Sequence, residues 1–399
     1  MMRVDERRLK IVTKGFEETF GAGRELMYFS APGRTEIGGN HTDHQQGRVL
    51  AAAVNLDMLA AVAFNDDGMI RMQSEGFRLC EVDLKDLSVD KKLYGTTLSL
   101  IRGMAAELQK RGAELRGFDA YVISDVLRGS GLSSSAAYEV LVGTIINELM
   151  FEGKATPIEI AQIGQIAENV YFGKPCGLMD QMASSVGNLV TIDFADKENP
   201  VVEKIDFDFS KSGHTLCIID SGADHADLTD EYAAVPGELK KVCAVFGKNV
   251  LREIPEEEFM KRIPEVRKAA GDRAVMRALH VYADNRRVVE QCEALKKNDF
   301  DTFLKLIRQS GESSWMYLQN VIPAGYKEHQ EMALALALCG KLLDGQGAYR
   351  VHGGGFAGTI QAFVPDEMVE DFVKGMEDVL GEGSCHCLSI RAEGGVRVS

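Results

Sequence analysis

The order of helical and strand patterns along the chain predicts an α+β fold. The first half mixes apolar runs typical of strands with amphipathic helical segments, whereas residues 237–312 are mostly helical in pattern. Helices that gather late in a mixed chain favour α+β. The 399 residues exceed what one small core usually serves, so we expect two domains. The polar segment DKENP at 196–200 is the expected junction between residues 1–200 and residues 201–399.

The individual elements of the first half follow from periodicity. Leu9, Val12, Phe16 and Phe20 recur at helical spacing, which predicts a helix over residues 6–20. The patterns that follow predict a strand at 28–34 running into a glycine-rich loop, one or two strands at 49–65, a strand at 70–76 with its partner at 80–84, a helix at 99–112 ended by Gly112, a strand at 117–126, helices at 134–150 and 158–172, and a strand at 188–194.

The second half begins with an alternating segment at 214–220, which predicts a strand. After the helical region, residues 325–343 predict one more helix. Residues 347–365 read as a strand, a glycine loop, and then a strand or a helix. The end of the chain, residues 385–398, has a β-like pattern.

Composition excludes several classes of function. The net charge of −15 argues against a nucleic-acid-binding protein, which needs a basic face. No run approaches the roughly 20 apolar residues of a membrane span. The charged N-terminal segment lacks the apolar core of a secretory signal, so we expect a cytoplasmic protein. The eight cysteines are then expected to be free thiols. Cys385 and Cys387 flank His386 too closely for the usual zinc spacing, and a strand is favoured there.

A glycine-rich segment, GSGLSSSAA at 129–137, lies between a predicted strand and a long apolar helix. Such a junction offers free backbone N–H groups and the positive end of a helix dipole, which suits a phosphate. The segment lacks the Gly-Lys-Ser/Thr of a Walker A loop. Its serines could instead only cap the helix. A second glycine loop, VHGGGFAG at 351–358, is equally consistent with a tight turn between strands.

Candidate acid–base groups are Asp180, in the apolar segment CGLMDQ at 176–181, and Glu168 on the helix before it. A carboxylate in such a setting can act as a base or a metal ligand when a cation lies nearby. Arg34 is a candidate partner. Taken alone, Asp180 could be a helix cap and Glu168 a solvated helix residue. Arg34 belongs to the segment GRTEIGGNHTDHQQG at 33–47, which places many polar groups between two apolar flanks.

Together these segments resemble the galactokinase branch of the GHMP small-molecule kinases. APGRTEIGGNHTDHQQG is similar to the sugar-binding signature of that family, GSGLSSSAAYEV to its ATP-phosphate loop, and VHGGGFAGTIQAFV to its C-terminal glycine motif. CGLMDQ matches the segment that carries the catalytic aspartate. The motifs occur in the family order. With weaker similarity between them, the resemblance covers nearly the whole chain.

The resemblance implies a two-domain GHMP kinase fold with the active site in the cleft between the domains. It implies ATP and Mg²⁺ as cofactors, and phosphoryl transfer from ATP to the anomeric hydroxyl of galactose, giving galactose 1-phosphate. From the composition we expect no nucleic-acid or membrane partner, and we expect a monomer or a weak homo-oligomer. The implied roles are Asp180 as base or orienter and Arg34 as its partner in catalysis; Glu36, Asn40, His41, Asp43, Gly177 and Tyr232 for sugar binding; Gly129, Ser130, Gly131, Leu132, Ser133, Ser134, Ser135 and Ala136 for ATP; and Ser134, Ser135 and Glu168 for the metal.

The sugar signature departs from the family pattern at several positions. Thr35 and Glu36 stand where the family usually has Val and Asn, Asn40 where it has Glu, and His44 where it has Tyr; Gly38 replaces Ile. In the family, the glutamate at position 40 accepts hydrogen bonds near O6 of the sugar. Asparagine there removes a negative charge and adds a donor.

A galacturonate kinase is therefore an alternative to a galactose kinase, because asparagine would tolerate a carboxylate at C6. Tyr232 also lacks the basic run that usually follows it, and His352 and Ala357 replace usual family residues. A non-catalytic sensor of sugar and ATP is a third hypothesis.

Overall fold

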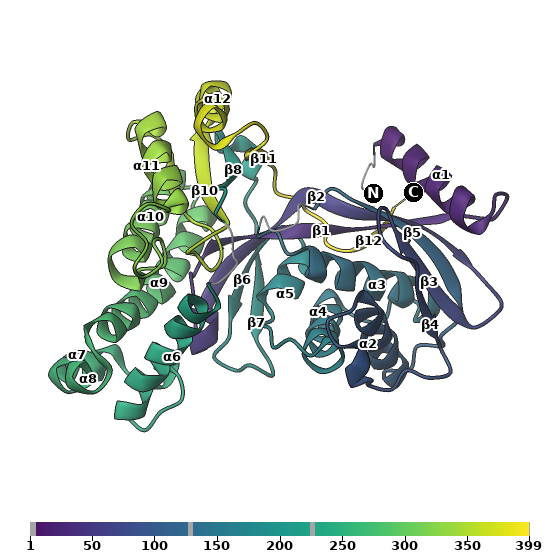
Figure 1. Ribbon diagram of the computed structural model, residues 1–399, viewed down its shortest axis with the longest axis horizontal. Helices are drawn as coiled ribbons and strands as arrows, with labels where there is room; N and C mark the ends of the chain where they lie inside the picture. Colours follow the sequence, from purple (N-terminus) through teal and green to yellow (C-terminus); the bar gives the residue numbers. More distant parts are fainter. Residues whose placement is uncertain (1–4, 127–130, 224–227, 399) are drawn as a thin grey trace.

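The structure is a computed structural model that describes residues 5–126, 131–223 and 228–398. Two β-sheets organise these residues (Figure 1). The strands of the first sheet are β1 (Met27–Gly38), β2 (Arg48–Phe64), β3 (Met69–Ser74), β4 (Cys80–Asp83), β5 (Phe118–Ser124), β6 (Leu189–Asp193), β7 (Val201–Ile205) and β12 (Val396–Val398). Their order is β12-β1-β2-β5-β3-β4, with β6 paired to β2 and β7 to β6. All pairs are antiparallel except β3 with β5.

The second sheet is smaller and antiparallel. Its strands are β8 (His214–Asp220), β9 (Ala348–Val351), β10 (Thr359–Pro365) and β11 (Cys385–Leu388), in the order β11-β8-β10-β9. Because β11 stands at one end of this order, it is an edge strand of that sheet.

The helices fall into two groups (Figure 1). Those around the first sheet are α1 (Glu6–Phe20), α2 (Thr97–Lys110), α3 (Ser134–Met150), α4 (Pro157–Ile166) and α5 (Met179–Val186). Those gathered with the second sheet are α6 (Thr229–Val245), α7 (Glu256–Lys261), α8 (Ile263–Ala270), α9 (Asp272–Lys296), α10 (Phe300–Ser313), α11 (Glu331–Leu343) and α12 (Val369–Leu380). The predicted α+β fold is confirmed. Among the described residues, we find no helix with the length and apolar character needed to cross a bilayer.

The long strand β2 shows why a nearly continuous apolar run forms a strand here. Side chains alternate between the two faces of a sheet. Leu59 and Ala61 face α1, while Met58, Ala60 and Val62 join the main core on the other face. Because helices cover both faces, both sets of positions are apolar. The region 49–65, predicted as one or two strands, is therefore one strand.

Several predicted elements need correction. The helix expected over 158–172 ends as an α-helix at Ile166 and continues as a π-helical turn, Ala167–Phe172. The helix expected to start at Gly325 starts at Glu331; Gly325 has a φ of +83°, which a right-handed helix excludes. The chain after the glycine loop of 351–358 is the strand β10. The sequence patterns also missed β7, a short exposed strand directly after the polar segment DKENP.

The domain boundary at 200/201 stays a prediction. Two strands beyond it belong to the first sheet: β7 pairs with β6, and β12, from the end of the chain, pairs with β1. The side chains of Val12 and Phe16 on α1 pack in one cluster with Val398 on β12. Elements from both ends of the chain therefore complete the first sheet.

Candidate active site

The sugar-signature segment begins inside strand β1 rather than in a loop after it. β1 continues through Gly38, and its register against β2 shifts between Pro32 and Arg34 and again between Glu36 and Gly38. Such bulges turn side chains away from the regular alternation of a strand and often lie beside active sites. Gly39 follows with a φ of +90°, and a Cβ there would lie 2.4 Å from the carbonyl oxygen of Arg48. Only glycine fits this turn.

Arg34 and Asp180 meet, as the resemblance implied. Nε and Nη2 of Arg34 each lie 2.8 Å from Oδ1 of Asp180, which stands in the first turn of α5. The hydroxyl of Ser133 donates to the other carboxylate oxygen, Oδ2. Nη1 of Arg34 donates to the carbonyl of Gly131. Residues from β1, from the segment before α3 and from α5 therefore converge on one carboxylate.

These contacts keep Asp180 ionised. Burial by itself would raise the pKa of Asp180, but the charge and hydrogen bond of Arg34, with the hydroxyl of Ser133, outweigh burial and hold the pKa below its usual value. Arg34 is also buried, yet its carboxylate partner raises the pKa of its guanidinium. The pair is thus a fixed negative and a fixed positive charge at ordinary pH.

His41 adopts a left-handed backbone conformation with a φ of +59°, which is uncommon outside glycine. Its Nε2 lies 2.9 Å from the carbonyl oxygen of Gly354 and must carry the proton of that hydrogen bond. Burial lowers the pKa of His41 to about 4, so the ring is neutral. Nδ1 is then an acceptor, and it is buried without a hydrogen-bond partner among the described residues. A backbone held in this way beside an unused acceptor is typical of a binding site.

Asp43 and Gly177, both expected at the sugar, lie next to each other. Asp43 begins the short 3₁₀ turn Asp43–Gln45, and a Cβ on Gly177 would lie 3.1 Å from its Oδ2. Nε2 of His44 stands 3.6 Å from the other carboxylate oxygen of Asp43. Gly177 is exposed and lies three residues before Asp180, and the charge of Asp43 also helps to raise the pKa of Arg34, which places Asp43 near the Arg34–Asp180 pair.

The positions that depart from the family pattern have partners in the second half of the chain. The hydroxyl of Thr35 bonds to Nε2 of His352 at 3.0 Å. Glu36 forms an ion pair with the fully buried Arg350, with Nη2 lying 2.5 Å from Oε1. Burial, opposed by Arg350, raises the pKa of the Glu36 carboxyl.

Asn40 is fully buried, and its side chain is occupied by protein groups. Nδ2 donates to the carbonyl of Gly353 at 2.6 Å and to Oε1 of Glu36 at 3.1 Å. Oδ1 accepts from Nδ2 of Asn320 at 2.9 Å. The amide of Asn40 therefore holds the C-terminal glycine loop against the sugar signature. The departures at 35, 36 and 40 form one polar network between the two halves of the chain.

Tyr232 lies on α6 and also contacts the C-terminal glycine loop. Its hydroxyl donates to the carbonyl of Gly355 at 2.7 Å, and its ring packs edge-on against Phe356. Burial raises the pKa of Tyr232 to about 12. The loop of 351–358 is thus a connection between β9 and β10 whose carbonyls accept from Asn40, His41 and Tyr232.

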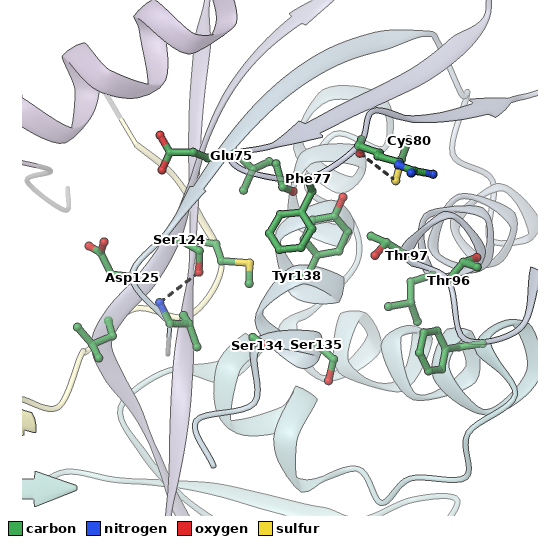
Figure 2. A pocket seen from close by; sticks show the side chains of 18 of the residues that line it. Glu75, Phe77, Cys80, Thr96, Thr97, Ser124, Asp125, Ser134, Ser135 and Tyr138 are labelled. Atoms are coloured by element: carbon green, nitrogen blue, oxygen red, sulfur yellow. Dashed lines mark hydrogen bonds between the residues drawn. The ribbon is translucent and has the colours of Figure 1, made fainter. Parts of the chain in front are cut away.

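A cavity of about 1290 Å³ opens at the start of α3 (Figure 2). Ser134 and Ser135, at the start of α3, line it together with the ring of Tyr138, one turn further along the helix. Phe77 from the β3–β4 turn, and Thr96 and Thr97 at the start of α2, line it as well. It combines aromatic surface with hydroxyl groups and the N-terminus of a 17-residue helix.

The expected ATP-binding residues fall into three groups. Gly129 and Ser130 lie outside the described residues. Ser134 and Ser135 line the cavity. Gly131, Leu132, Ser133 and Ala136 lie beside it: Leu132 and Ala136 are buried, Ser133 bonds to Asp180, and Gly131 has a φ of +71°. A Cβ on Gly131 would lie 3.0 Å from Nδ1 of His352.

Glu168, the expected metal ligand, stands in the π-helical turn after α4 and is nearly buried. Nε2 of Gln181 lies 2.9 Å from its Oε2 and 2.9 Å from Oε2 of Glu139. Burial and the Glu168 charge raise the pKa of Glu139 well above its usual value. The described residues contain no group of three or more His, Cys, Asp and Glu side chains arranged for a metal.

The sequence patterns did not indicate several of the residues that the structure places at this site. Gln181 follows Asp180 directly, but nothing in the pattern links it to two glutamates. Arg350 is a single charge in the apolar strand β9, and such a charge signals a buried partner. Nothing in the sequence marked Phe77 and Tyr138 as cavity residues, because aromatic residues are as frequent in hydrophobic cores as in binding sites.

Comparisons with known proteins agree with this geometry. Residues 14–64 match the family described as galactokinase galactose-binding signature, and residues 99–188 match the GHMP kinases N terminal domain. Structural relatives include Lactococcus lactis galactokinase complexed with galactose (TM-score 0.81, 24% identity, 98% of this chain and 100% of that chain). A mevalonate kinase shares the fold at a TM-score of 0.63 and 14% identity, over 92% of this chain and 99% of that chain.

Fold and site together define a small-molecule kinase of the GHMP class. The sequence relatives are more specific. A galactokinase of Glaesserella parasuis is 33% identical over 363 residues, covering 89% of each chain. A galactokinase of Lacticaseibacillus casei is 33% identical over 371 residues, covering 91% of each chain. The chain belongs to the galactokinase family.

Proposed function

We propose that the protein transfers the γ-phosphoryl group of ATP to the anomeric hydroxyl of galactose. The observation that carries this proposal is the position of the Arg34–Asp180 pair. Arg34 belongs to the sugar-signature segment, and Asp180 accepts a hydrogen bond from Ser133, which directly precedes the cavity-lining Ser134 and Ser135. A phosphoryl group can pass between two ligands only where both sites meet, and phosphoryl transfer asks mainly for positioning and charge stabilisation.

Asp180 orients the attacking hydroxyl in this proposal. A carboxylate whose pKa is held below its usual value is a weak base towards a ground-state sugar hydroxyl. It is still a strong hydrogen-bond acceptor, and the proton passes to it as the oxygen bonds to phosphorus. Arg34, fixed against Asp180 and the Gly131 carbonyl, places positive charge beside the transferring group.

The sugar is held by residues that border the space beside Asp180. His41 offers the acceptor Nδ1 to a sugar hydroxyl, and Asp43 offers carboxylate oxygens, with Gly177 allowing close approach. Tyr232 contributes through the glycine loop that it packs against. For Glu36 and Asn40 we propose a supporting role, because Arg350, Gly353 and Asn320 already occupy their polar groups.

ATP occupies the cavity, with the base against Tyr138 and Phe77 and the phosphates towards residues 131–136. The first N–H groups of α3 have no partners within the helix, and the helix dipole favours an anion there. The hydroxyls of Ser134 and Ser135 add donors beside them.

Mg²⁺ would be held by Glu168 with a hydroxyl of Ser134 or Ser135. One carboxylate, a hydroxyl, phosphate oxygens and waters make a typical Mg²⁺ shell, so this donor set fits the ion without a cluster of several carboxylates. Oε1 of the neighbouring Glu139 and Oε1 of Gln181 are buried without partners among the described residues, which suits a polar occupant close by. The ion supplies charge neutralisation on the phosphates when bound.

The two alternatives receive no comparable support. The galacturonate hypothesis rests on the missing negative charge at Asn40, but the Asn40 amide is bonded to protein groups and offers no contact that would favour a C6 carboxylate. A sensor would not need the paired Arg34 and Asp180. We also propose a cytoplasmic location, which the eight free cysteines support. We further propose a monomer or weak homo-oligomer, which sedimentation would test.

The test is ADP release with Mg²⁺–ATP over a panel of galactose, galacturonate, N-acetylgalactosamine, glucose and glucuronate, with identification of the phosphorylated carbon. Galactose should be the preferred substrate and galactose 1-phosphate the product. A preference for galacturonate would overturn the choice of substrate. Binding of both ligands without ADP release would favour the sensor.

A further inference from the structure

Two cysteines outside the proposed catalytic pair face each other across neighbouring strands. Cys217 on β8 and Cys387 on β11 are direct partners in the antiparallel register. Their Sγ atoms lie 3.7 Å apart. Both are free thiols, as are the other six cysteines.

The backbone geometry at this pair suits a covalent link. The amide of Asp220 donates to the carbonyl of Ser384 at 2.8 Å, one residue beyond the pair formed by Ile219 and Cys385. Antiparallel pairs alternate between hydrogen-bonded and non-hydrogen-bonded, so Cys217 and Cys387 form a non-hydrogen-bonded pair. Cα atoms in such pairs lie about 4.5 Å apart, within the range of disulfides. A rotation of the two side chains would close the bond without moving the strands.

The two thiols differ in access. Cys387 lies on the edge strand, is exposed and lines the large cavity, whereas Cys217 is fully buried behind it. The hydrogen bond from Cys217, opposed by partial burial, lowers the pKa of the Cys387 thiol to about 7. An exposed thiolate with a second thiol directly behind it is the arrangement of an attacking and a resolving cysteine.

We propose that Cys387 and Cys217 are a reversible modification site that forms a cross-strand disulfide with a low-molecular-weight disulfide as oxidant. The Cys387 thiolate attacks one sulfur of the oxidant, and the first thiol of the oxidant leaves as a thiolate. The Cys217 sulfur then attacks Cys387 Sγ in the mixed disulfide and expels the second thiolate. Two cysteines are oxidised, one disulfide is reduced to two thiols, and the two cysteine protons end on them.

The test uses oxidised glutathione on the full chain, followed by blocking of remaining thiols, tryptic digestion and mass spectrometry. Peptide 212–240 contains Cys217 alone, but peptide 375–391 contains both Cys385 and Cys387. The variant C385S therefore assigns the partner. Wild type and C385S should both give linked 212–240 and 375–391, and reduction should reverse the link.

Two further variants separate the steps. C217S should stop at a glutathione adduct on peptide 375–391, and C387S should leave Cys217 reduced. C292S, which removes a buried thiol on α9, should behave as wild type. A link that disappears in C385S, or a wild-type protein whose Cys387 accepts glutathione without ever linking to Cys217, would overturn the proposal.

Discussion

The sugar-signature segment and the cavity at the start of α3, the two sides of the proposed site, are built in opposite ways. On the sugar-signature side, polar side chains are buried and already bonded to each other: Glu36 to Arg350, and Asn40 to Asn320. On the other side, a cavity of about 1290 Å³ remains open at the start of α3. The difference shows which part of the proposed site is rigid before a ligand binds. A small sugar is recognised by directed hydrogen bonds, which require a pre-organised network, whereas a nucleotide is held by backbone N–H groups and a large cavity.

The largest effect is expected where the two sides meet. Asp180→Asn should lower kcat by about 10²–10⁴-fold, because the amide loses the charge that orients the hydroxyl and accepts its proton. Binding of ATP, measured by calorimetry, should change only a few fold. The exposed Asp371→Asn on α12 is the matched control and should keep wild-type turnover. Turnover of Asp180→Asn within tenfold of wild type would remove the role of Asp180.

Removing one member of the buried polar network on the sugar side should lower the unfolding free energy of the protein. Arg350→Met leaves Glu36 buried without its cation, which should cost about 3–5 kcal/mol of unfolding free energy. Chemical denaturation measures this loss. The exposed pair of Arg267 and Asp272 offers a control, since Arg267→Met should leave the unfolding free energy close to that of wild type.

The double variant Glu36→Gln with Arg350→Met removes both charges and should recover part of the stability. If it is as unstable as the sum of the two single variants, the ion pair is not the coupling between them.

Low pH should lower the unfolding free energy through the buried histidines on the same side. The pKa of His41 is lowered to about 4 in the folded protein from 6.5, and that of His352 to about 3, in both cases chiefly by burial. As pH falls, the histidines are therefore protonated in the unfolded chain before they are protonated in the folded protein. The stabilisation by the neutral, buried histidines is complete above pH 6.5 and is lost as pH falls towards the folded pKa values.

For His41 the shift corresponds to on the order of 3 kcal/mol. The unfolding free energy, followed by denaturant titration from pH 7 to pH 5, should fall less steeply in His41→Gln than in wild type. Equal slopes in the two proteins would mean that His41 does not titrate as its burial implies.

The smallest effect is expected on the cavity side. Ser135→Ala removes one hydroxyl beside the helix N-terminus, and a single neutral hydrogen bond is worth about 0.5–1.5 kcal/mol. KM for ATP should rise roughly two- to tenfold, with KM for galactose unchanged. The exposed Ser88→Ala serves as control. An equal rise in both KM values would argue that the two sides are not separate.

Much of the fold was accessible from local pattern. Residues 6–20 and 134–150 were predicted with the bounds that the structure has, because their apolar spacing and end signals are local properties. The π-helical turn at Ala167–Phe172 was not, since helical periodicity cannot distinguish an α-helical turn from a wider one. That turn carries Glu168.

The sequence by itself determined most of the order of elements and the family, and it marked Arg34 and Asp180 as candidate residues, because these depend on spacing and on motifs within short segments. Only the tertiary structure decided the partners of Thr35, Glu36 and Asn40. Those partners lie between 280 and 317 residues away along the chain. It also decided that Cys217 faces Cys387, and that Phe77 and Tyr138 face a cavity. Such pairings depend on how distant segments approach each other in space, which no local pattern records.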